Sequence, residues 1–249
     1  MKREYYGEYF ALEREHWWFR ARRNILGAQV AWLTSRVPGR PRILNVGAAL
    51  GASSDMLAVY GDVVSLEFDA NSCAFVRREF GKTFINASVT ELPFESDYFD
   101  LVCAFDVIEH VKDDGLAARE MIRVCKGGGC IAVTVPAFMM LWSHHDAVNE
   151  HYRRYRLPDL QRLFEPSGEV LFASYFNAIL FMPIAGVRLL TKLLPTRWVR
   201  TGSGSDFSLA SNGSIDALCY RVLNAENAWL RHRRSLPFGV SAYLAWRKR

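Results

Sequence analysis

Short apolar runs alternate with helix-compatible stretches through the middle of the chain. The runs of strand character occupy residues 42–46, 63–67, 83–86, 99–105 and 129–135. The helix-compatible stretches between them occupy residues 52–60, 71–80 and 114–125. Strands separated by helices of this length are typical of a parallel sheet with helices on both faces. Because right-handed crossovers bring the carboxyl ends of such strands to one edge, we expect a ligand site along that edge.

The N-terminal segment has a different pattern. Apolar residues recur at helical spacing in residues 16–33, HWWFRARRNILGAQVAWL, and leave a basic face. The sequence PGRP at 38–41 then breaks the helix before the first strand. We therefore predict an N-terminal helical lid over residues 1–40, followed by an α/β core over residues 41–177.

The segment after Pro136 is less regular. Residues 138–156 mix aromatic, histidine and arginine side chains without a clear period. Residues 157–164 resemble a short helix, and residues 169–176 resemble a sixth strand. The sheet is therefore expected to continue beyond five strands after an irregular excursion.

An unusual apolar block follows at 178–195, AILFMPIAGVRLLTKLLP, interrupted by Pro183 and Gly186. A membrane-spanning helix needs about 20 mostly apolar residues, so this broken and charged block predicts an amphipathic or covering helix. A flexible Gly/Ser-rich loop at 201–214 and a helix-compatible stretch at 215–232 come next.

The last strand candidate is FGVSAYLAW at 238–246. The helical stretches before it predict a helical insertion or cover over residues 178–235. Residues 236–249 would then return to the core as its final strand.

Composition narrows the setting of the protein. Half of its 249 residues are hydrophobic, which is enough for a sizeable core and too many for a disordered chain. The five cysteines are scattered without a CxxC pair, so we expect reduced thiols. The N-terminal residues lack the long apolar segment of a secretory signal, which favours a cytoplasmic protein.

The net charge of +5 is unevenly distributed. From Arg188 onward there are 11 Lys and Arg against three acids, a balance of +8, which leaves −3 for the preceding residues. A basic tail that is also apolar suits an anionic partner or a membrane surface, and a solvated basic face explains it equally well. We expect any peripheral membrane contact to involve residues 178–200.

The most informative stretch is RILNVGAALG at 42–51, in which a strand runs into a turn of small residues. Such a turn lets the backbone approach a ligand closely. Glu67 follows Gly47 by twenty residues, at the end of the next apolar run. A carboxylate there can accept hydrogen bonds from both hydroxyls of a ribose. Turn and acid together predict a nucleoside-type cofactor.

Five landmarks carry a family resemblance: ILNVGAALG, SLEFD at 65–69, ASVTELPF at 87–94, FDLVCAFDVIEHV at 99–111 and VCKGGG at 124–129. The chain resembles the class I S-adenosylmethionine-dependent methyltransferases that act on small molecules, whose first motif reads roughly hhDhGxGxG. VCKGGG resembles the turn that precedes the family's fifth strand. The resemblance implies a Rossmann-like, doubly wound, mostly parallel sheet of seven strands with an antiparallel last strand. It also implies S-adenosylmethionine as the cofactor.

The resemblance assigns cofactor-binding roles to the first motif. Gly47 and Gly51 would form the turn under the methionine part of the cofactor. Asn45 stands where the family usually has Asp, and it keeps an acceptor but loses the negative charge. Ala49 stands where a second glycine is usual, and its methyl group is costly if φ is positive there.

The next two motifs would hold the nucleoside. Glu67 is expected to bind the ribose, and Phe68 to pack nearby. Ser88 would accept a hydrogen bond from the exocyclic amine of adenine more weakly than the family's usual Asp. Val89 would pack against the adenine ring.

The fourth motif would form the methyl-transfer opening. Asp106 is expected to contact the methionine end of the cofactor. Arg22, on the N-terminal helix, would pair with the carboxylate of the cofactor if that helix acts as a lid. His110 is a candidate general base because histidine titrates near neutral pH, although a purely structural histidine is an equal alternative.

Further histidines follow the fifth strand, where the family usually meets its substrate. His144 and His145 are candidates for the general base or for substrate contact. His144, His145 and Asp146 could be read as metal ligands, but adjacent histidines seldom converge on one ion without further ligands. No metal is therefore expected.

The predicted function is methyl transfer to an oxygen or nitrogen atom of a small or lipid-linked metabolite. The departures at Asn45 and Ala49 leave open a catalytically weak relative that binds cofactor or a partner. A nicotinamide-dependent reductase fits less well, because the chain lacks a Tyr-x-x-x-Lys pair. Nucleic acid is not an expected partner, because no asparagine-proline-proline-aromatic motif is present. The oligomeric state stays open.

Overall fold

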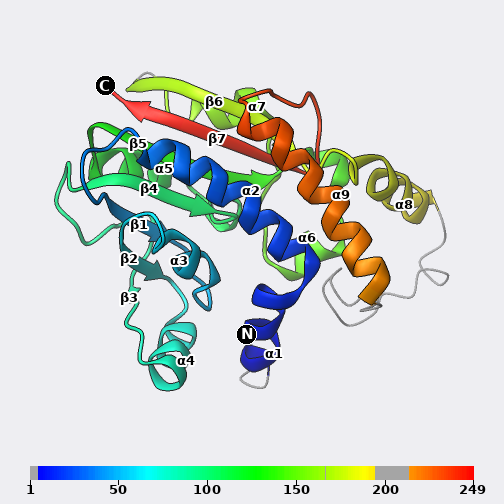
Figure 1. Cartoon of the computed structure of the whole chain (residues 1–249), viewed down its shortest axis with the longest axis horizontal. Helices are drawn as coiled ribbons and strands as arrows, with labels where there is room; N and C mark the ends of the chain where they lie inside the picture. Colours follow the sequence, from blue (N-terminus) through cyan, green and yellow to red (C-terminus); the bar gives the residue numbers. More distant parts are fainter. Residues whose placement is uncertain (1–4, 166, 194–212) are drawn as a thin grey trace.

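The computed structural model describes residues 5–165, 167–193 and 213–249, which surround one seven-stranded sheet (Figure 1). The strands are β1 (Arg42–Val46), β2 (Asp62–Glu67), β3 (Ile85–Asn86), β4 (Phe99–Phe105), β5 (Cys125–Pro136), β6 (Gly168–Phe176) and β7 (Ser241–Lys248). Their order is β3-β2-β1-β4-β5-β7-β6, and β7 runs antiparallel to both of its neighbours. The expected doubly wound, mostly parallel sheet of seven strands is confirmed.

Helices cover both faces of this sheet. They are α1 (Tyr5–Glu15), α2 (Trp17–Thr34), α3 (Ala52–Leu57), α4 (Ala70–Phe80), α5 (Asp114–Val124), α6 (His144–Val148), α7 (Leu157–Arg162), α8 (Phe181–Leu193) and α9 (Gly213–Arg231). Two single-turn 3-10 helices, η1 (Ile108–His110) and η2 (Met139–Leu141), follow β4 and β5.

The core is divided by the sheet into two layers, because successive side chains of a strand point to opposite faces. On β1, Leu44 packs into the layer that contains residues of α5 and α7. Its neighbour Ile43 packs into the layer formed with residues of α2, α3 and α9. Figure 1 shows α2 and α9 crossing the same face of the sheet.

The strand order reverses between β1 and β4, since β1 pairs in parallel with both β2 and β4. The loops that leave neighbouring strands at such a switch point diverge to opposite sides, which opens a crevice beyond their carboxyl ends. The turn after β1, the end of β2 and the end of β4 therefore meet at this place.

The predicted N-terminal lid separates into two helices with different surroundings. Tyr6 of α1 packs with Ala48, Leu50, Val76 and Phe84, which lie in or beside the turn after β1 and the helix after β2. In contrast, α2 contributes to the layer that packs on the face of the sheet. Helix α1 therefore lies over the turn after β1 as a lid would.

Two sequence expectations differ from the structure. VCKGGG was expected as a turn before the fifth strand, but β5 already begins at Cys125. Pairing with β4 shifts register between Phe99 and Leu101, and Gly128 has a φ of 78°, so this stretch is an irregular strand extension. The expected strand at 83–86 is reduced to two residues, Ile85–Asn86.

The expected helical insertion is present in part. Helix α8 falls within 178–195, and α9 spans nearly all of 215–232. Most of the expected loop at 201–214 lies outside the described residues. Within the part of the chain that the structure describes, no helix is long and apolar enough to cross a membrane.

Candidate functional site

The turn between β1 and α3 has the backbone geometry of a ligand-binding loop. Gly47 has a φ of 69° and Gly51 a φ of 95°, both in the region that favours glycine. A Cβ atom on Gly47 would lie 2.5 Å from Cγ2 of Val107, so a larger residue does not fit there. Ala49 has a φ of 47°, which means that its methyl group carries the steric cost of a left-handed conformation.

Glu67 ties the end of β2 to this turn. One carboxylate oxygen accepts the backbone N–H of Ala49 at 2.8 Å, and the other accepts the N–H of Asp69 at 2.8 Å. Each oxygen can accept more than one hydrogen bond, so the carboxylate keeps capacity for two hydroxyl groups. The residue therefore fits the ribose-binding role that we predicted for it.

Asn45 supports the turn from below. Its side chain is buried, and its amide nitrogen donates to the hydroxyls of Ser53 at 2.8 Å and Ser54 at 2.9 Å. Ser54 in turn shares a hydrogen bond of 2.8 Å with Ser65 of β2. The amide thus fastens the first turn of α3 to the strands, where an Asp would have accepted both hydroxyl hydrogens.

The predicted adenine contacts lie around β3. Phe68 is 76% exposed and has room to pack against a ring. Asn86 donates to the carbonyl oxygens of Glu67 and Phe68 at 2.9 and 2.8 Å, which fixes the chain beyond β2. The hydroxyl of Ser88 shares a hydrogen bond with Thr90, and Val89 is buried in the core beside it.

At the end of β4, the structure brings Asp106 and Arg22 together. The Arg22 guanidinium lies 2.5 Å from a carboxylate oxygen of Asp106 and 2.6 Å from the hydroxyl of Thr134 on β5. Arg22 itself is buried, and its guanidinium lies over the ring of Phe176. Asp106 has a φ of 57°, a strained conformation of the kind that clusters at functional sites. The predicted partner of Arg22 was a cofactor carboxylate, and in the free protein Asp106 takes that place.

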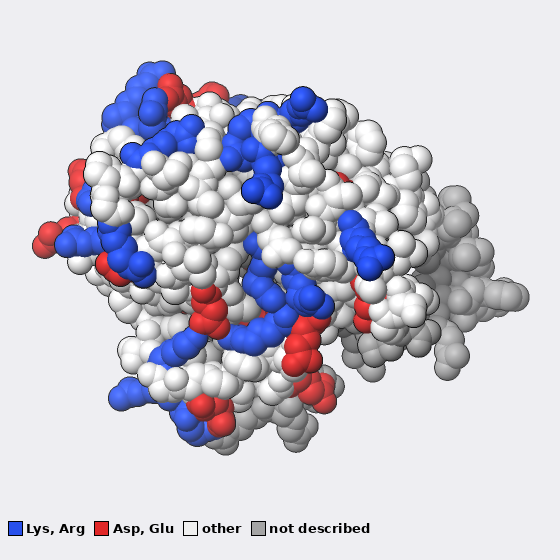
Figure 2. Space-filling model, in the orientation of Figure 1, with Lys and Arg blue, Asp and Glu red and all other residues white. Residues whose placement is uncertain are grey.

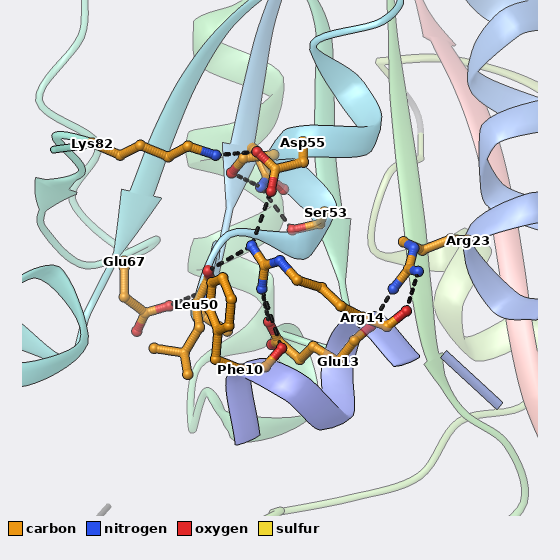
Figure 3. A network of polar contacts seen from close by, with 12 residues as sticks. Phe10, Glu13, Arg14, Arg23, Leu50, Ser53, Asp55, Glu67 and Lys82 are labelled. Carbon is orange, nitrogen blue, oxygen red and sulfur yellow. Dashed lines mark hydrogen bonds and ion pairs between the residues drawn. The ribbon is translucent and has the colours of Figure 1, made fainter. Parts of the chain in front are cut away.

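Helix α1 closes over the turn through a polar network (Figure 3). Arg14 donates to the carbonyl oxygen of Leu50 and to the Asp55 carboxylate at 2.9 Å, and it lies against the ring of Phe10. Glu13, beside it, is buried against the backbone N–H groups of Leu50 and Ala52. The lid is thus anchored on the same turn that would hold the cofactor.

Burial beneath α1 raises the pKa values of two of its residues, Tyr9 and Glu13. Burial raises the pKa of the Tyr9 phenol, and the negative charges of Glu13, Asp106 and Glu67 raise it further. The acids that raise it include Glu67 at the end of β2 and Asp106 after β4. Burial also raises the pKa of Glu13 to about 7, against the opposing effects of Arg14 and the backbone N–H groups.

The three predicted catalytic histidines lie in different surroundings. His110 is exposed at the end of η1, and its ring lies edge-on to His151 with centroids 4.5 Å apart. Partial burial lowers the pKa of His110, and the neighbouring His151 lowers it further, which favours the neutral form that a base requires. His144 is exposed at the start of α6, and His145 contacts the amide of Asn149.

A buried ionic network supports the loop that carries these histidines. Asp146 is 0% exposed and pairs with Arg154 at 2.7 Å and with the Nδ1 atom of His151 at 2.9 Å. Its second oxygen accepts the backbone N–H of Ser143. Arg154 is thus bound to Asp146 through two nitrogens.

Glu109 lies beside this network and is also 0% exposed. Burial raises its pKa well above the ordinary value, and the negative charge of Asp106 raises it further. Arg22 and Arg154 lower the pKa from a distance, but neither bonds to the Glu109 carboxylate. Its surroundings therefore favour the protonated carboxyl group over the carboxylate.

A pocket of about 750 Å³ is lined by residues of α2, α3 and α9 and lies away from the carboxyl ends of the strands. Its lining includes Arg14, Arg23 and Arg231 together with Asp55. Figure 2 shows basic and acidic side chains meeting near the middle of the corresponding face. None of the predicted cofactor residues lines this pocket.

Residues 44–133 match the family described as methyltransferase domain. A probable S-adenosylmethionine-dependent methyltransferase of Mycobacterium tuberculosis is 30% identical over 127 residues, which cover 50% of this chain and 44% of the relative. Its counterpart in Mycolicibacterium smegmatis is 30% identical over 161 residues, covering 63% and 61%. Residues 44–133 thus match a methyltransferase domain, and the relatives are described as S-adenosylmethionine-dependent.

A third relative is the demethylmenaquinone methyltransferase of Renibacterium salmoninarum, 38% identical over 99 residues that cover 39% of this chain and 41% of the relative. The chain thus spans about half the length of the curated relatives it matches. The match to the methyltransferase family runs from β1 into β5.

Solved structures support the same fold for the methyltransferase domain. A methyltransferase from Archaeoglobus fulgidus covers 96% of this chain and 99% of its own, with a TM-score of 0.54 and 15% identity. The [4+2]-cyclase SpnF covers 90% of this chain and 81% of its own, with a TM-score of 0.56 and 20% identity. At such identities the likeness establishes the fold alone.

Three residues of the candidate site were not identified from the sequence. Tyr9 and Glu13 come from a segment read only as helical and aromatic, and no local pattern places them over the strand ends. Glu109 was visible in DVIEHV beside His110, and an acid within an otherwise apolar run was the signal that could have marked it.

Proposed function

We propose that the protein transfers a methyl group from S-adenosylmethionine to an oxygen or nitrogen atom of a small or lipid-linked metabolite. The observation that carries this proposal is the meeting of the Gly47–Gly51 turn, Glu67 and Asp106 at one strand edge. The two acids end β2 and follow β4, the two strands that flank β1. This spacing suits a ligand with a ribose at one end and a charged amino acid at the other.

The chain's own residues have defined tasks in such a reaction. Bound S-adenosylmethionine supplies the methyl group, and its sulfur keeps the electron pair of the broken carbon–sulfur bond. The protein aligns the acceptor with the methyl carbon and excludes water. We assign to His110 the removal of the acceptor's proton, because its exposed, neutral imidazole lies one turn beyond Asp106.

A lipid-linked acceptor is supported by two observations. Relatives named demethylmenaquinone methyltransferases share the domain. Helix α8 and the residues before it also present apolar side chains to solvent, namely Ile179 at 51%, Met182 at 69% and Val187 at 61% exposure. Apolar exposure beside basic residues favours peripheral contact with an anionic membrane through residues 178–200.

Methyl-labelled S-adenosylmethionine and a fractionated cell extract test the proposal. The labelled cofactor is incubated with protein and extract, and the label is then followed into lipid and water-soluble fractions. We expect protein-dependent label in one fraction, with more in the lipid fraction, and a strong decrease for His110→Ala. Absence of protein-dependent label at every pH tested would contradict the proposal.

A catalytically weak, cofactor-binding module is the second candidate, and the left-handed Ala49 favours it. The SpnF cyclase shows that a protein of this fold can be named for another reaction. Binding of S-adenosylhomocysteine without any label transfer would favour the module. Label transfer above the rate without protein would exclude it.

A further inference from the structure

A group of three side chains at the end of β4 is not explained by the cofactor site. Glu109 and His110 lie on η1, and His151 lies in the loop after α6. One potential ligand atom from each, a carboxylate oxygen or a ring nitrogen, lies within 4.8 Å of the other two. The proposed reaction uses His110 alone, which leaves the position of Glu109 and His151 without a role.

Glu109 holds acceptor capacity that the chain does not satisfy. Apart from its own backbone N–H, no residue that the structure describes donates a hydrogen bond to either carboxylate oxygen. The nearby guanidinium groups are committed elsewhere, Arg22 to Asp106 and Arg154 to Asp146. Buried acids are normally paired or bound to a metal, so a fully buried carboxyl group without a donor indicates a missing partner.

His151 is oriented as a metal-binding histidine would be. Its Nδ1 atom lies 2.9 Å from the buried carboxylate of Asp146, which two bonds from Arg154 hold in place. A hydrogen bond from Nδ1 to a carboxylate fixes the ring and its tautomer and leaves the Nε2 lone pair for a ligand. The histidine, its supporting acid and the arginine behind that acid thus form one ordered unit.

His110 completes the group from the solvent side. Its ring lies against that of His151, and the backbone of Asn149 acts on its pKa. A neutral imidazole keeps one ring nitrogen as an acceptor that can bind a metal ion. Because His110 is exposed while Glu109 is buried, the group is closed on the protein side and open toward solvent.

We propose that Glu109, His110 and His151 bind a divalent transition-metal ion such as Zn²⁺, Mn²⁺ or Co²⁺. Two imidazoles and one carboxylate are a common ligand set for these ions, whereas Mg²⁺ and Ca²⁺ prefer oxygen ligands. Ligand atoms that each lie about 2.1 Å from one ion are roughly 3–3.5 Å from one another. Side-chain rotations that move these atoms by about 1 Å would bring the three ligands to that spacing. Three protein ligands leave at least one position free, as in catalytic metal sites.

The role of the ion rests on the proposed function, although its binding does not. Asp106 precedes Glu109 by one turn and marks the expected methionine end of the cofactor. An acceptor hydroxyl bound in the free position would lie beside that end, and the ion would lower the pKa of that hydroxyl. Because the ion would occupy the acceptor nitrogen of His110, this lowered pKa would replace the role of His110 as the base. The chemical class of acceptor that this favours is a hydroxyl compound with a second oxygen able to chelate.

Titration of the full-length, chelator-treated protein with Co²⁺ tests the site. Calorimetry measures stoichiometry and affinity, and visible absorption distinguishes nitrogen and oxygen ligands from thiolates, which matters because five free cysteines are present. We expect one equivalent per chain with a Kd in the micromolar range or below, and no thiolate charge-transfer band.

Three variants locate the ion. Glu109→Gln preserves shape and His151→Ala removes a ligand, so each should weaken binding at least 100-fold while circular dichroism stays unchanged. His144→Ala removes an exposed histidine from the same loop and should leave the affinity within twofold. A thermal shift on adding Co²⁺ should occur for wild type and His144→Ala, and it should be lost in the other two variants.

Two results would overturn the inference: no saturable equivalent of Co²⁺ on folded protein, or unchanged affinity in both Glu109→Gln and His151→Ala. A parallel titration with S-adenosylhomocysteine separates this failure from that of the proposed function. Cofactor binding without metal binding rejects the metal site alone, and loss of cofactor binding rejects the proposed function whatever the metal does.

Discussion

The two halves of the strand edge are built in opposite ways. At β1 and β2, the Glu67 carboxylate and the backbone of the turn satisfy each other through bonds of 2.8 Å. At the end of β4, Glu109 is 0% exposed, yet no other described residue donates to its carboxylate. The first half is organised before a ligand arrives, whereas the second half holds polar groups that the chain leaves unmatched.

This difference teaches what kind of ligand each half suits. A turn whose backbone is already fixed loses little entropy when a cofactor binds, which favours a ligand common to the whole family. In the β4 half, the buried Asp146 and Arg154 hold the ring of His151 in place. Substrate choice and any metal are therefore expected to depend on the β4 half.

The largest expected effect comes from the support of the β4 half. Asp146→Asn leaves the buried guanidinium of Arg154 without its negatively charged partner. This loss should lower the free energy of unfolding by about 3 kcal/mol. Denaturant unfolding of wild type and variant measures the difference. Asp159→Asn, in an exposed pair with Arg162, is the matched control and should cost less than about 0.5 kcal/mol.

The pH dependence of Asp146 sharpens that prediction. Although burial opposes ionisation, hydrogen bonds from His151 and Arg154 hold the pKa of Asp146 below its ordinary value. A lowered pKa stabilises the folded state above the unfolded pKa of about 4, and the contribution is lost as the pH falls further. The difference in free energy of unfolding between wild type and Asp146→Asn should therefore become smaller below about pH 4. A difference that does not change with pH would contradict the account.

In the β1–β2 half, Glu13 should make stability depend on pH in the opposite direction to Asp146. Because the pKa of Glu13 rises from 4.5 to about 7, the folded state binds this proton more tightly than the unfolded state does. This contribution to stability is highest below pH 4.5 and falls by about 3 kcal/mol as the pH rises toward about 7. Glu13→Gln should remove this slope in the cofactor-free protein, measured by unfolding at several pH values. Glu79→Gln, at an exposed acid, should keep the slope.

The smallest expected effect concerns the strained turn. Ala49→Gly relieves a left-handed alanine, and after the entropy cost of glycine it should stabilise the protein by about 0.5–1 kcal/mol. Thermal unfolding measures this gain, and Ala48→Gly at the buried neighbour is the control that should destabilise. If Ala49→Gly also destabilised the protein, the left-handed geometry of the turn would be in doubt.

Much of the β1–β2 half could be predicted from sequence, because its signals are local. The turn of small residues and Glu67 stand at fixed positions in the motif, and the strand periodicity around them places both at one edge. The local signal failed at Asn45, whose amide turned out to fasten Ser53 and Ser54 beneath the turn. Which way a buried amide faces depends on its neighbours in space.

The lid and the β4 half could be predicted only in part, because they depend on contacts between distant segments. Tyr9 meets the strand ends through the packing of α1, which no periodicity in residues 1–15 specifies. His110 and Asp106 were recognisable within DVIEHV. The burial of Glu109, however, depends on a loop folded around Asp146 some forty residues later.

Calorimetric titration with S-adenosylhomocysteine tests the central claim, that the β1–β2 half is a ready-made cofactor site. Wild-type protein should bind one equivalent per chain, and Glu67→Ala should weaken binding about 10- to 100-fold through loss of charged hydrogen bonds. Glu91→Ala, at an exposed acid between β3 and β4, should bind as wild type does. Absence of binding to folded wild-type protein, or equal affinity in Glu67→Ala, would contradict the account.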